Sequence, residues 1–394
     1  MATPAVYPFI DASHPFHARL EGFRARIAAD PGLAGAVGVG TRLRGGLRAR
    51  PDPDGRWRIE RFYWCAQWWE PGASPRFCAR TLLYDVRHGE AAEIYDFPRD
   101  PRLRAASEPG SPLAAAGVEV LRYIPLQRLT FRTGDTVGKM KRPASVRRSF
   151  ERLGVVAEAA RRAEASFAVP ARLGLDTKRS MFFQELVAGP PVAELLCGAN
   201  ADELLRALGS VHREIHELSA PRLPARPMQA VLDEARDDLA WIGFVAPPHA
   251  GALRRVERWL EHELGASAGA ADAVCHGDFD PSHVLAGAGR WAVIDFDDAT
   301  VGDPYAELGT MLALLRHDAP ELRLRAGPGA LARARASYLA GYAERAGIAL
   351  VRRRLAAQRV RAEVALLASR LRKGFGDGEQ IDRWVARLQE LCRA

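Results

Sequence analysis

The sequence has 394 residues, of which 48% are hydrophobic and 26% are charged. This composition is typical of a soluble globular protein and excludes a mostly disordered chain, while the length predicts two or three domains. No apolar run approaches the ~20 residues that a membrane span needs, and the first residues show no secretory signal. We therefore expect a cytoplasmic protein.

The formal net charge is +8, from 56 Lys and Arg against 48 Asp and Glu. The basic residues are scattered over helical patterns and form no single block, which favours solvated helix faces over a nucleic-acid surface. Because the five cysteines lie far apart without a Cys-x-x-Cys pair, we expect neither a disulfide framework nor a zinc site. Neither nucleic acid nor a membrane is expected as a partner.

Residues 1–112 are expected to form an N-terminal α/β accessory domain. A helical pattern near residues 16–29 precedes an antiparallel sheet, and residues 97–117, rich in Pro, Asp, Ser and Gly, mark a boundary. The first strand carries a run of aromatic residues, which favours core packing over a carbohydrate or nucleic-acid platform. These aromatic residues are Phe62, Tyr63, Trp64, Trp68 and Trp69. The strands are expected at residues 57–69, 76–86 and 91–97.

Residues 113–187 are expected to form a second, β-rich unit. Gly134 and Asp135 suit a tight hairpin turn, and Pro143 suits the first turn of a long helix that runs to residue 165. From residue 188 onward the pattern predicts a mainly helical lobe. The strands of the second unit are expected at residues 118–123, 127–132, 136–141, 171–176 and 181–187.

One strand-loop-strand passage, residues 272–304, interrupts the helical pattern. It contains a His-Gly-Asp triplet that ends at Asp278, then His283, then Asp295 at the end of an apolar run. Side chains at the ends of paired strands face a common mouth, so these three groups are expected to converge. Two protein ligands, with nucleotide phosphates completing the shell, suit Mg²⁺, and a further carboxylate can accept a hydroxyl proton.

The motifs H-G-D-F-D-P-S-H-V-L and I-D-F-D-D-A-T-V-G-D-P-Y-A-E-L resemble those of the aminoglycoside phosphotransferase and choline kinase-like family. The resemblance covers roughly residues 118–394. It implies an α+β protein with a bilobal, protein-kinase-like fold, in which a small β-rich N-lobe (residues 113–187) joins a mainly helical C-lobe (residues 188–394). The accessory domain at residues 1–112 is an addition to that fold.

The resemblance implies ATP or GTP and Mg²⁺ as cofactors, and it gives roles to three residues. Asp278 is expected to be the catalytic base or the orienting carboxylate for the acceptor hydroxyl, and Asp295 a metal ligand. His283 stands where most relatives have Asn, although macrolide phosphotransferases also look to have His there. It is expected to be a second metal ligand through an imidazole nitrogen. The alternative is a neutral, hydrogen-bonding histidine in a site that binds metal poorly.

Lys139 and Lys141 lie two residues apart on one strand, so periodicity does not choose between them as the cation that binds phosphate. The resemblance favours Lys139, paired with a glutamate of the next helix, for which Glu158 fits better than Glu151. It also implies a hinge at Glu185–Val187 whose backbone holds the adenine edge. No glycine-rich loop joins the first two strands of this unit.

Residues around these motifs are expected to play supporting parts. His276 is expected to brace its loop, while Asp303 and Glu307 cap and orient the helix that begins there. Six helical acids lie where the resemblance places the acceptor-binding helices and could receive a cationic substrate, although solvated helix faces are the favoured interpretation. They are Asp233, Glu234, Asp237, Asp238, Glu257 and Glu261.

We therefore predict a small-molecule kinase that transfers the γ-phosphoryl group of ATP or GTP to a hydroxyl of an antibiotic, sugar or natural-product intermediate. One alternative keeps the fold and phosphorylates a sugar or amino sugar, resembling maltokinases, which also carry an extra N-terminal domain. The other, motivated by His283 and the missing glycines, is a non-catalytic nucleotide-binding protein. Acceptor pockets have no fixed residue spacing, so the sequence leaves the acceptor open.

Overall fold

The described part of the chain covers nine stretches of a computed structural model, together with Ala25. The helix expected near residues 16–29 lies outside them, apart from Ala25, which is helical. Among the described helices none is both long and apolar enough to cross a membrane. The stretches are residues 42–51, 57–70, 76–85, 92–265, 272–287, 289–317, 329–346, 351–373 and 378–393.

The N-terminal part forms a four-stranded antiparallel sheet, which we call the accessory sheet, in the order β1-β2-β3-β4. The three strands expected from the sequence are present, and β1 adds a fourth that lacks aromatic and β-branched residues. Gly45 and Gly46 of β1 lie opposite Trp64 and Tyr63, whose rings occupy the space that a Cβ atom would need. The strands are β1 (Arg42–Pro51), β2 (Trp57–Glu70), β3 (Arg76–Asp85) and β4 (Ala92–Asp96).

The second unit is a five-stranded antiparallel sheet in the order β5-β6-β7-β9-β8, and helix α3 packs on it. Alternation gives this sheet one apolar face, which includes Phe131 and Met140, and one polar face, on which Arg128 lies directly opposite Lys141. The predicted hairpin turn at Gly134 joins β6 to β7. The elements are β5 (Glu119–Ile124), β6 (Arg128–Thr133), β7 (Thr136–Lys141), α3 (Pro143–Arg162), β8 (Arg172–Asp176) and β9 (Met181–Glu185).

The rest of the chain is mainly helical, as expected, with short strands that carry the loops of the H-G-D and I-D-F-D-D motifs. The short strands are β10 (Ala225–Arg226), β11 (Ala273–Cys275), β12 (Val284–Ala286), β13 (Trp291–Val293) and β14 (Thr300–Gly302). The helices are α4 (Val192–Leu195), α5 (Ala201–Glu217), α6 (Met228–Val245), α7 (Ala250–Gly265), α8 (Pro304–His317), α10 (Ala330–Ala346), α11 (Arg352–Arg372) and α12 (Gly378–Leu391).

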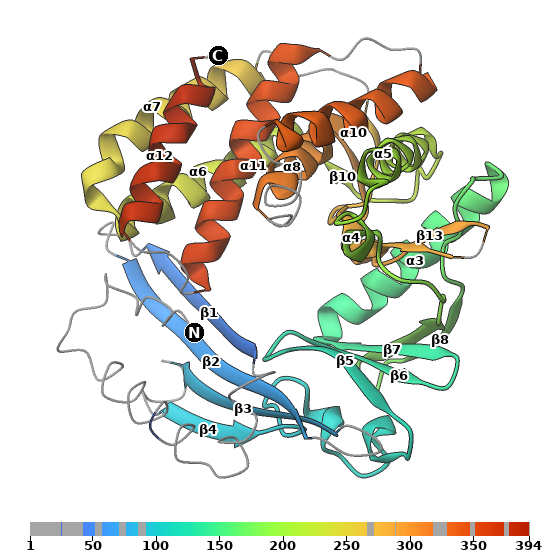
Figure 1. Ribbon diagram of the computed structural model, residues 1–394. Coiled ribbons are helices and arrows are strands. Elements are labelled where there is room, and N and C mark those ends of the chain that lie inside the picture. Colours follow the sequence, from blue (N-terminus) through green and yellow to red (C-terminus); the bar gives the residue numbers. More distant parts are fainter. Residues whose placement is uncertain are drawn as a thin grey trace.

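Both faces of the accessory sheet are buried, each against a different part of the protein. Phe62 and Trp64 share an apolar core with α6, α7, α11 and α12, whereas Tyr63 and Cys65 share a core with the five-stranded sheet. In Figure 1 the accessory sheet (blue) extends from the red and yellow helices to the teal five-stranded sheet. The aromatic run of β2 is therefore core, and it connects the accessory sheet to both lobes.

The turn between β5 and β6, where many kinases carry glycines, is fixed by residues of the accessory region. Leu126 adopts a left-handed conformation, with φ of +65°. Its amide donates to Asp100 at 2.8 Å, and the hydroxyl of Tyr123 donates to the same carboxylate at 2.8 Å. Gln67 of β2 adds a hydrogen bond of 2.9 Å to the Tyr123 carbonyl. These contacts hold the turn in a conformation that a non-glycine residue rarely adopts.

Replacing Phe62 with Ala is expected to lower the free energy of unfolding by about 3–5 kcal/mol, because it leaves a cavity between the accessory sheet and the helices. Phe62 is 1% exposed and its ring stacks on Tyr84 at 5.0 Å. Ile94→Ala on β4 is the control, since Ile94 is 40% exposed and its replacement should cost only about 1 kcal/mol. Urea unfolding measures both; equal losses would contradict a core shared with the helices.

Candidate active site

The loops of the two motifs meet because the strands beside them pair. β12 and β13 are antiparallel, and the amide of Ile294 donates to the carbonyl oxygen of His283 at 2.9 Å. This bond places His283 next to Asp295, while Asp278 lies at the other edge of the His283 ring. The structure thus brings together the three residues that the sequence singled out in this passage.

The imidazole of His283 is held in one orientation. Its Nδ1 lies 2.7 Å from the carbonyl oxygen of Asp278, which can only accept, so Nδ1 carries a proton and donates it. In the neutral ring the lone pair then belongs to Nε2, which lies 3.6 Å from Oδ2 of Asp295. A lone pair that faces a carboxylate oxygen at this distance suits a cation placed between the two.

Two lysines of the five-stranded sheet reach across to the second loop. Lys139 Nζ lies 2.6 Å from Oδ1 of Asp295 and 3.2 Å from Oδ1 of Asp297. Lys141 Nζ lies 2.7 Å from Oδ2 of Asp297 and 3.0 Å from Oγ of Ser149 on α3. The structure therefore distinguishes the lysines that periodicity could not, because only Lys139 contacts both aspartates.

Two arginines that the sequence did not single out complete this charged cluster. Nη1 of Arg128 lies 3.4 Å from Oδ2 of Asp295, and Arg152 on α3 donates to the carbonyl oxygen of Asp297 at 2.8 Å. Arginines are scattered along the whole sequence, so neither residue carried a signal of its own. The place of Arg128 beside Lys141 follows only from the register of β6 on β7.

Burial and charge oppose each other within the cluster. Burial disfavours an ionised Asp295, but the cations Lys139 and Arg128 outweigh it and hold the pKa of this carboxyl well below its usual range. At Lys139 burial favours the neutral amine, yet Asp297 and then Asp295 outweigh it and raise the pKa of Lys139. Both partners are therefore charged at neutral pH.

Asp278 lies in a different electrostatic setting. Partial removal of water raises the pKa of Asp278, and the nearby carboxylates of Asp280 and Asp295 raise it further, against the opposing effect of His283. Its side chain is 54% exposed, so the carboxylate remains open to a ligand. A raised pKa makes this carboxylate a better proton acceptor, which is what a general base requires.

The predicted pairing of Lys139 with Glu158 is wrong for this structure. The Glu158 side chain is 37% exposed and binds Arg161 at 2.8 Å, and this bond lowers the pKa of Glu158. Glu151, the other candidate, is also exposed. The carboxylate that helix α3 was expected to supply comes instead from Asp297, on the second motif loop.

Glu307 on α8 holds the backbone of the H-G-D loop. Its carboxylate accepts hydrogen bonds from the backbone amides of His276 at 2.9 Å and Gly277 at 2.6 Å. It also accepts from Nε2 of His212 at 3.2 Å and of His216 at 3.0 Å, both on α5. Burial opposes its charge, but the two histidine bonds hold the pKa of Glu307 well below its usual range. Glu307 therefore ties α5 and α8 to the H-G-D loop.

The capping role that the sequence predicted for Asp303 and Glu307 belongs to Asp303 alone. Asp303 accepts from the amide of Tyr305 at 2.9 Å at the start of α8. It also accepts from Gln358 at 2.7 Å, which ties α8 to α11. Glu307 lies one turn further along and turns toward the loop.

The H-G-D loop is also braced from within, as expected for His276. Nε2 of His276 donates to the carbonyl of Ile294 at 2.9 Å, and its Nδ1 accepts from the amide of Asp278 at 3.2 Å. Gly277 has a φ of +91°, and a Cβ atom there would collide with the backbone of Asp298. The backbone that carries Asp278 is therefore fixed on both sides.

The chain leaves the five-stranded sheet at the hinge expected over Glu185–Val187. The amide of Glu185 donates to Ala171 at 2.9 Å, and that of Leu186 donates to Asp135 at 2.9 Å. Among the described residues, the Val187 amide makes no backbone hydrogen bond. The fold thus uses the amides of Glu185 and Leu186 within the protein.

The helical acids considered as a cationic-substrate surface lie mostly beside arginines. Such pairs neutralise charge that a polycation would otherwise meet, although each exposed pair adds little stability. The interpretation as helix faces therefore accounts for most of them. The pairs are Asp233–Arg236, Glu234–Arg226, Asp238–Arg372 and Glu261–Arg236.

A small β-sheet lobe, a mainly helical lobe and a lysine–aspartate contact between them define a protein of the kinase-like fold. The family model described as "Phosphotransferase enzyme family" matches residues 127–355, more than half of the 394 residues. The chain belongs to this family, and it is a phosphotransferase enzyme. No curated protein matches the sequence.

Solved structures of related enzymes are similar in fold. An apo thermostable mutant of aminoglycoside phosphotransferase APH(4)-Ia has a TM-score of 0.52 and 16% identity, over 70% of this chain and 94% of that chain. The ternary complex of such a mutant with AMP-PNP and hygromycin B has a TM-score of 0.51 and 15% identity, over 71% of this chain and 94% of that chain. A choline/ethanolamine kinase family protein from Mesorhizobium loti has a TM-score of 0.46 and 19% identity, over 74% of this chain and 94% of that chain. At these identities the likeness to the two APH(4)-Ia structures concerns the fold alone.

Acid is expected to destabilise the protein through His212. Burial and then His216 lower the pKa of His212 to about 3, whereas in an unfolded chain a histidine titrates near 6.5. The unfolded state therefore binds more protons between these values, so the free energy of unfolding falls as pH drops from about 6.5, by up to ~1.4 kcal/mol per pH unit.

Urea unfolding at pH 7.5, 6.5, 5.5 and 4.5 measures this slope. His212→Gln removes the titrating group, so its stability should depend less on pH across this range than that of the wild type. Phe279→Leu is the control, because it loosens the packing against the His212 ring, 3.8 Å away, and keeps the titrating group. An unchanged slope in His212→Gln would contradict the assignment.

Proposed function

We propose that this protein is a small-molecule kinase that uses ATP or GTP, with Mg²⁺, to phosphorylate a hydroxyl of an antibiotic, sugar or natural-product intermediate. The observation that carries the proposal is the 2.6 Å contact between Lys139 and Asp295, with Asp278 beside His283 at its edge. Positioning and charge stabilisation supply most of the catalysis in phosphoryl transfer. A lysine, a metal-binding carboxylate and a base are the parts that this requires.

The nucleotide site in this proposal lies between the two lobes. The backbone of Glu185 and Val187 holds the nucleobase edge, and Lys139 contacts the phosphates. Asp295 and His283 fit a divalent cation, because an anionic oxygen and the ring Nε2 face each other and the Asp278 carbonyl fixes the ring. Bound Mg²⁺ supplies positive charge to the phosphate oxygens.

Asp278 acts on the acceptor in this proposal. Its carboxylate takes the proton of the acceptor hydroxyl while the oxygen forms a bond to the γ-phosphorus, and the bond to the β–γ bridging oxygen breaks to release the nucleoside diphosphate. The braced loop and the exposed carboxylate support this role. They also argue against a non-catalytic protein, for which neither a fixed base nor an oriented His283 is needed.

Asp278→Asn is expected to lower kcat by roughly 10³-fold while nucleotide affinity stays unchanged, because the base contacts the acceptor only. Asp295→Asn should instead abolish Mg²⁺-dependent nucleotide binding. Calorimetry with ATP and GTP, each with and without Mg²⁺, and a transfer assay measure the two effects. Asp298→Asn, 72% exposed in the same loop, is the control. Full turnover in both test variants would end the assignment.

The two lysines should differ in their effect on nucleotide affinity. Lys139→Met is expected to weaken ATP binding roughly 10- to 100-fold, since it removes charge-assisted hydrogen bonds to phosphate, and Lys141→Met should weaken it less. Glu158→Gln should leave it unchanged, because Glu158 pairs with Arg161. Equal losses in the two lysine variants, or a loss in Glu158→Gln, would contradict this arrangement.

A further inference from the structure

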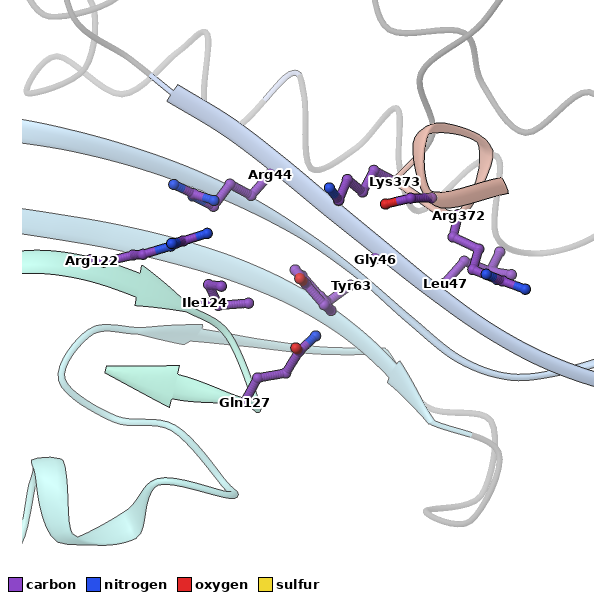
Figure 2. Close-up of a pocket in the computed structure, with 11 residues that line it drawn as sticks. Arg44, Gly46, Leu47, Tyr63, Arg122, Ile124, Gln127, Arg372 and Lys373 are labelled. Carbon is purple, nitrogen blue, oxygen red and sulfur yellow. The ribbon is translucent and has the colours of Figure 1, made fainter. Parts of the chain in front are cut away.

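A cavity of about 670 Å³ lies where the accessory sheet meets both lobes. Its walls come from β1 and β2, from β5 and the turn after it, and from the C-terminal end of α11. Figure 2 shows that Arg44, Arg122 and Gln127 enter it from separate strands and the turn, with Lys373 coming from the end of α11. The cavity therefore exists only because the accessory sheet packs on both lobes.

The lining is basic. Four cations contribute to it, and none of the lining residues within the described part of the chain is acidic. Arg372 is bound by Asp238 at 2.6 Å, and Arg44 donates to the neutral amide of Gln67 at 3.2 Å. Tyr63 and Gln127 add neutral polar groups that can donate hydrogen bonds. The four cations are Arg44, Arg122, Arg372 and Lys373.

Among these four cations, Arg122 gives the strongest indication of an anion site. Its Nε is buried without a hydrogen-bond partner among the described residues, and the same holds for Nε of Arg128 on the neighbouring strand. Burial lowers the pKa of Arg122, and the positive charges of Arg128 and Arg44 lower it further. Like charges crowded around an unsatisfied buried donor are unfavourable unless an anion joins them.

The cavity is linked to the transfer site through β5 and β6. Ile124, which lines the cavity, pairs with Arg128, and Nη1 of Arg128 lies 3.4 Å from Oδ2 of Asp295. Asp295 and Asp278 both act electrostatically on Arg122, in the direction that favours its charge. Arg122 and Arg128 also lie on the polar face of the five-stranded sheet that carries Lys139 and Lys141. A ligand in the cavity can thus reach toward Asp278 while its far end meets the arginines.

We propose that the cavity binds the acceptor through an oxyanion, carboxylate or phosphate, so that the acceptor is a hydroxylated acid. This inference rests on the proposed kinase function and names its substrate class. Arg122 and Arg44 donate to the oxyanion, as guanidinium groups do with planar fork geometry. The pairing of most helical acids with arginines agrees with it, because a polycationic acceptor would find few unneutralised carboxylates there.

The test uses the full chain loaded with AMP-PNP and Mg²⁺ and a matched set of probes: glucose, gluconate, glucose 6-phosphate and glucosamine. Calorimetry should find that one or both acids bind at least about tenfold more tightly than glucose, and that glucosamine does not. Gluconate and glucose 6-phosphate separate a carboxylate from a phosphate preference. Arg122→Gln and Arg44→Gln should each weaken binding of the acids by about tenfold.

Lys178→Gln is the control, because Lys178 is an exposed cation in the β8–β9 turn, and it should bind all probes as the wild type does. Preferred binding of glucosamine or glucose overturns the proposal, as does failure of both acids to bind. A parallel loss of AMP-PNP affinity in both arginine variants would assign these residues to the nucleotide and overturn it too. If AMP-PNP does not bind but the acids bind through Arg122, the kinase function fails and the anion site stands.

Discussion

The charged cluster between the five-stranded sheet and the motif loops is the interaction on which the site depends. Lys139, Asp295 and Asp297 are only 9%, 12% and 4% exposed. Burying a charge is costly unless an opposite charge meets it, and removing one partner leaves the other uncompensated. The two lobes must therefore approach each other in a register that pairs these groups. That same register sets His283 beside Asp295, with Asp278 at the other edge of its ring.

The accessory sheet joins the lobes a second time, away from the hinge. Its two buried faces pack on different lobes, so neither face is free to serve as a separate domain surface. Asp100 and Gln67 also hold β5 and the turn that follows it. Leu126 keeps its left-handed conformation because the surrounding hydrogen bonds determine it, where other kinase-like proteins use glycine. The β5–β6 turn thus lacks the glycines of a glycine-rich loop, and hydrogen bonds from the accessory region hold its conformation instead.

Much of the fold was predictable because its signals are local. The alternation of apolar and polar residues predicted the strands of both sheets, and the helical period of apolar residues predicted the helices. Strand β1 was not predicted, because its arginines and glycines are poor strand formers. The predicted pairing of Glu158 with Lys139 was wrong for a related reason. The helical position of Glu158 was predicted correctly, but helix α3 turns that face to solvent. Which face of a helix meets the site is decided by packing, and packing has no local sequence signature.

The sequence by itself determined the two motif loops and the convergence of Asp278, His283 and Asp295, because short spacings and paired strands hold them together. Only the tertiary structure decided which cations meet those acids, since Lys139 and Asp295 lie 156 positions apart and Arg128 and Asp295 lie 167 apart. The basic cavity likewise arises from three segments that are distant in sequence. Contacts of this kind follow from how the lobes and the accessory sheet pack, which local periodicity does not record.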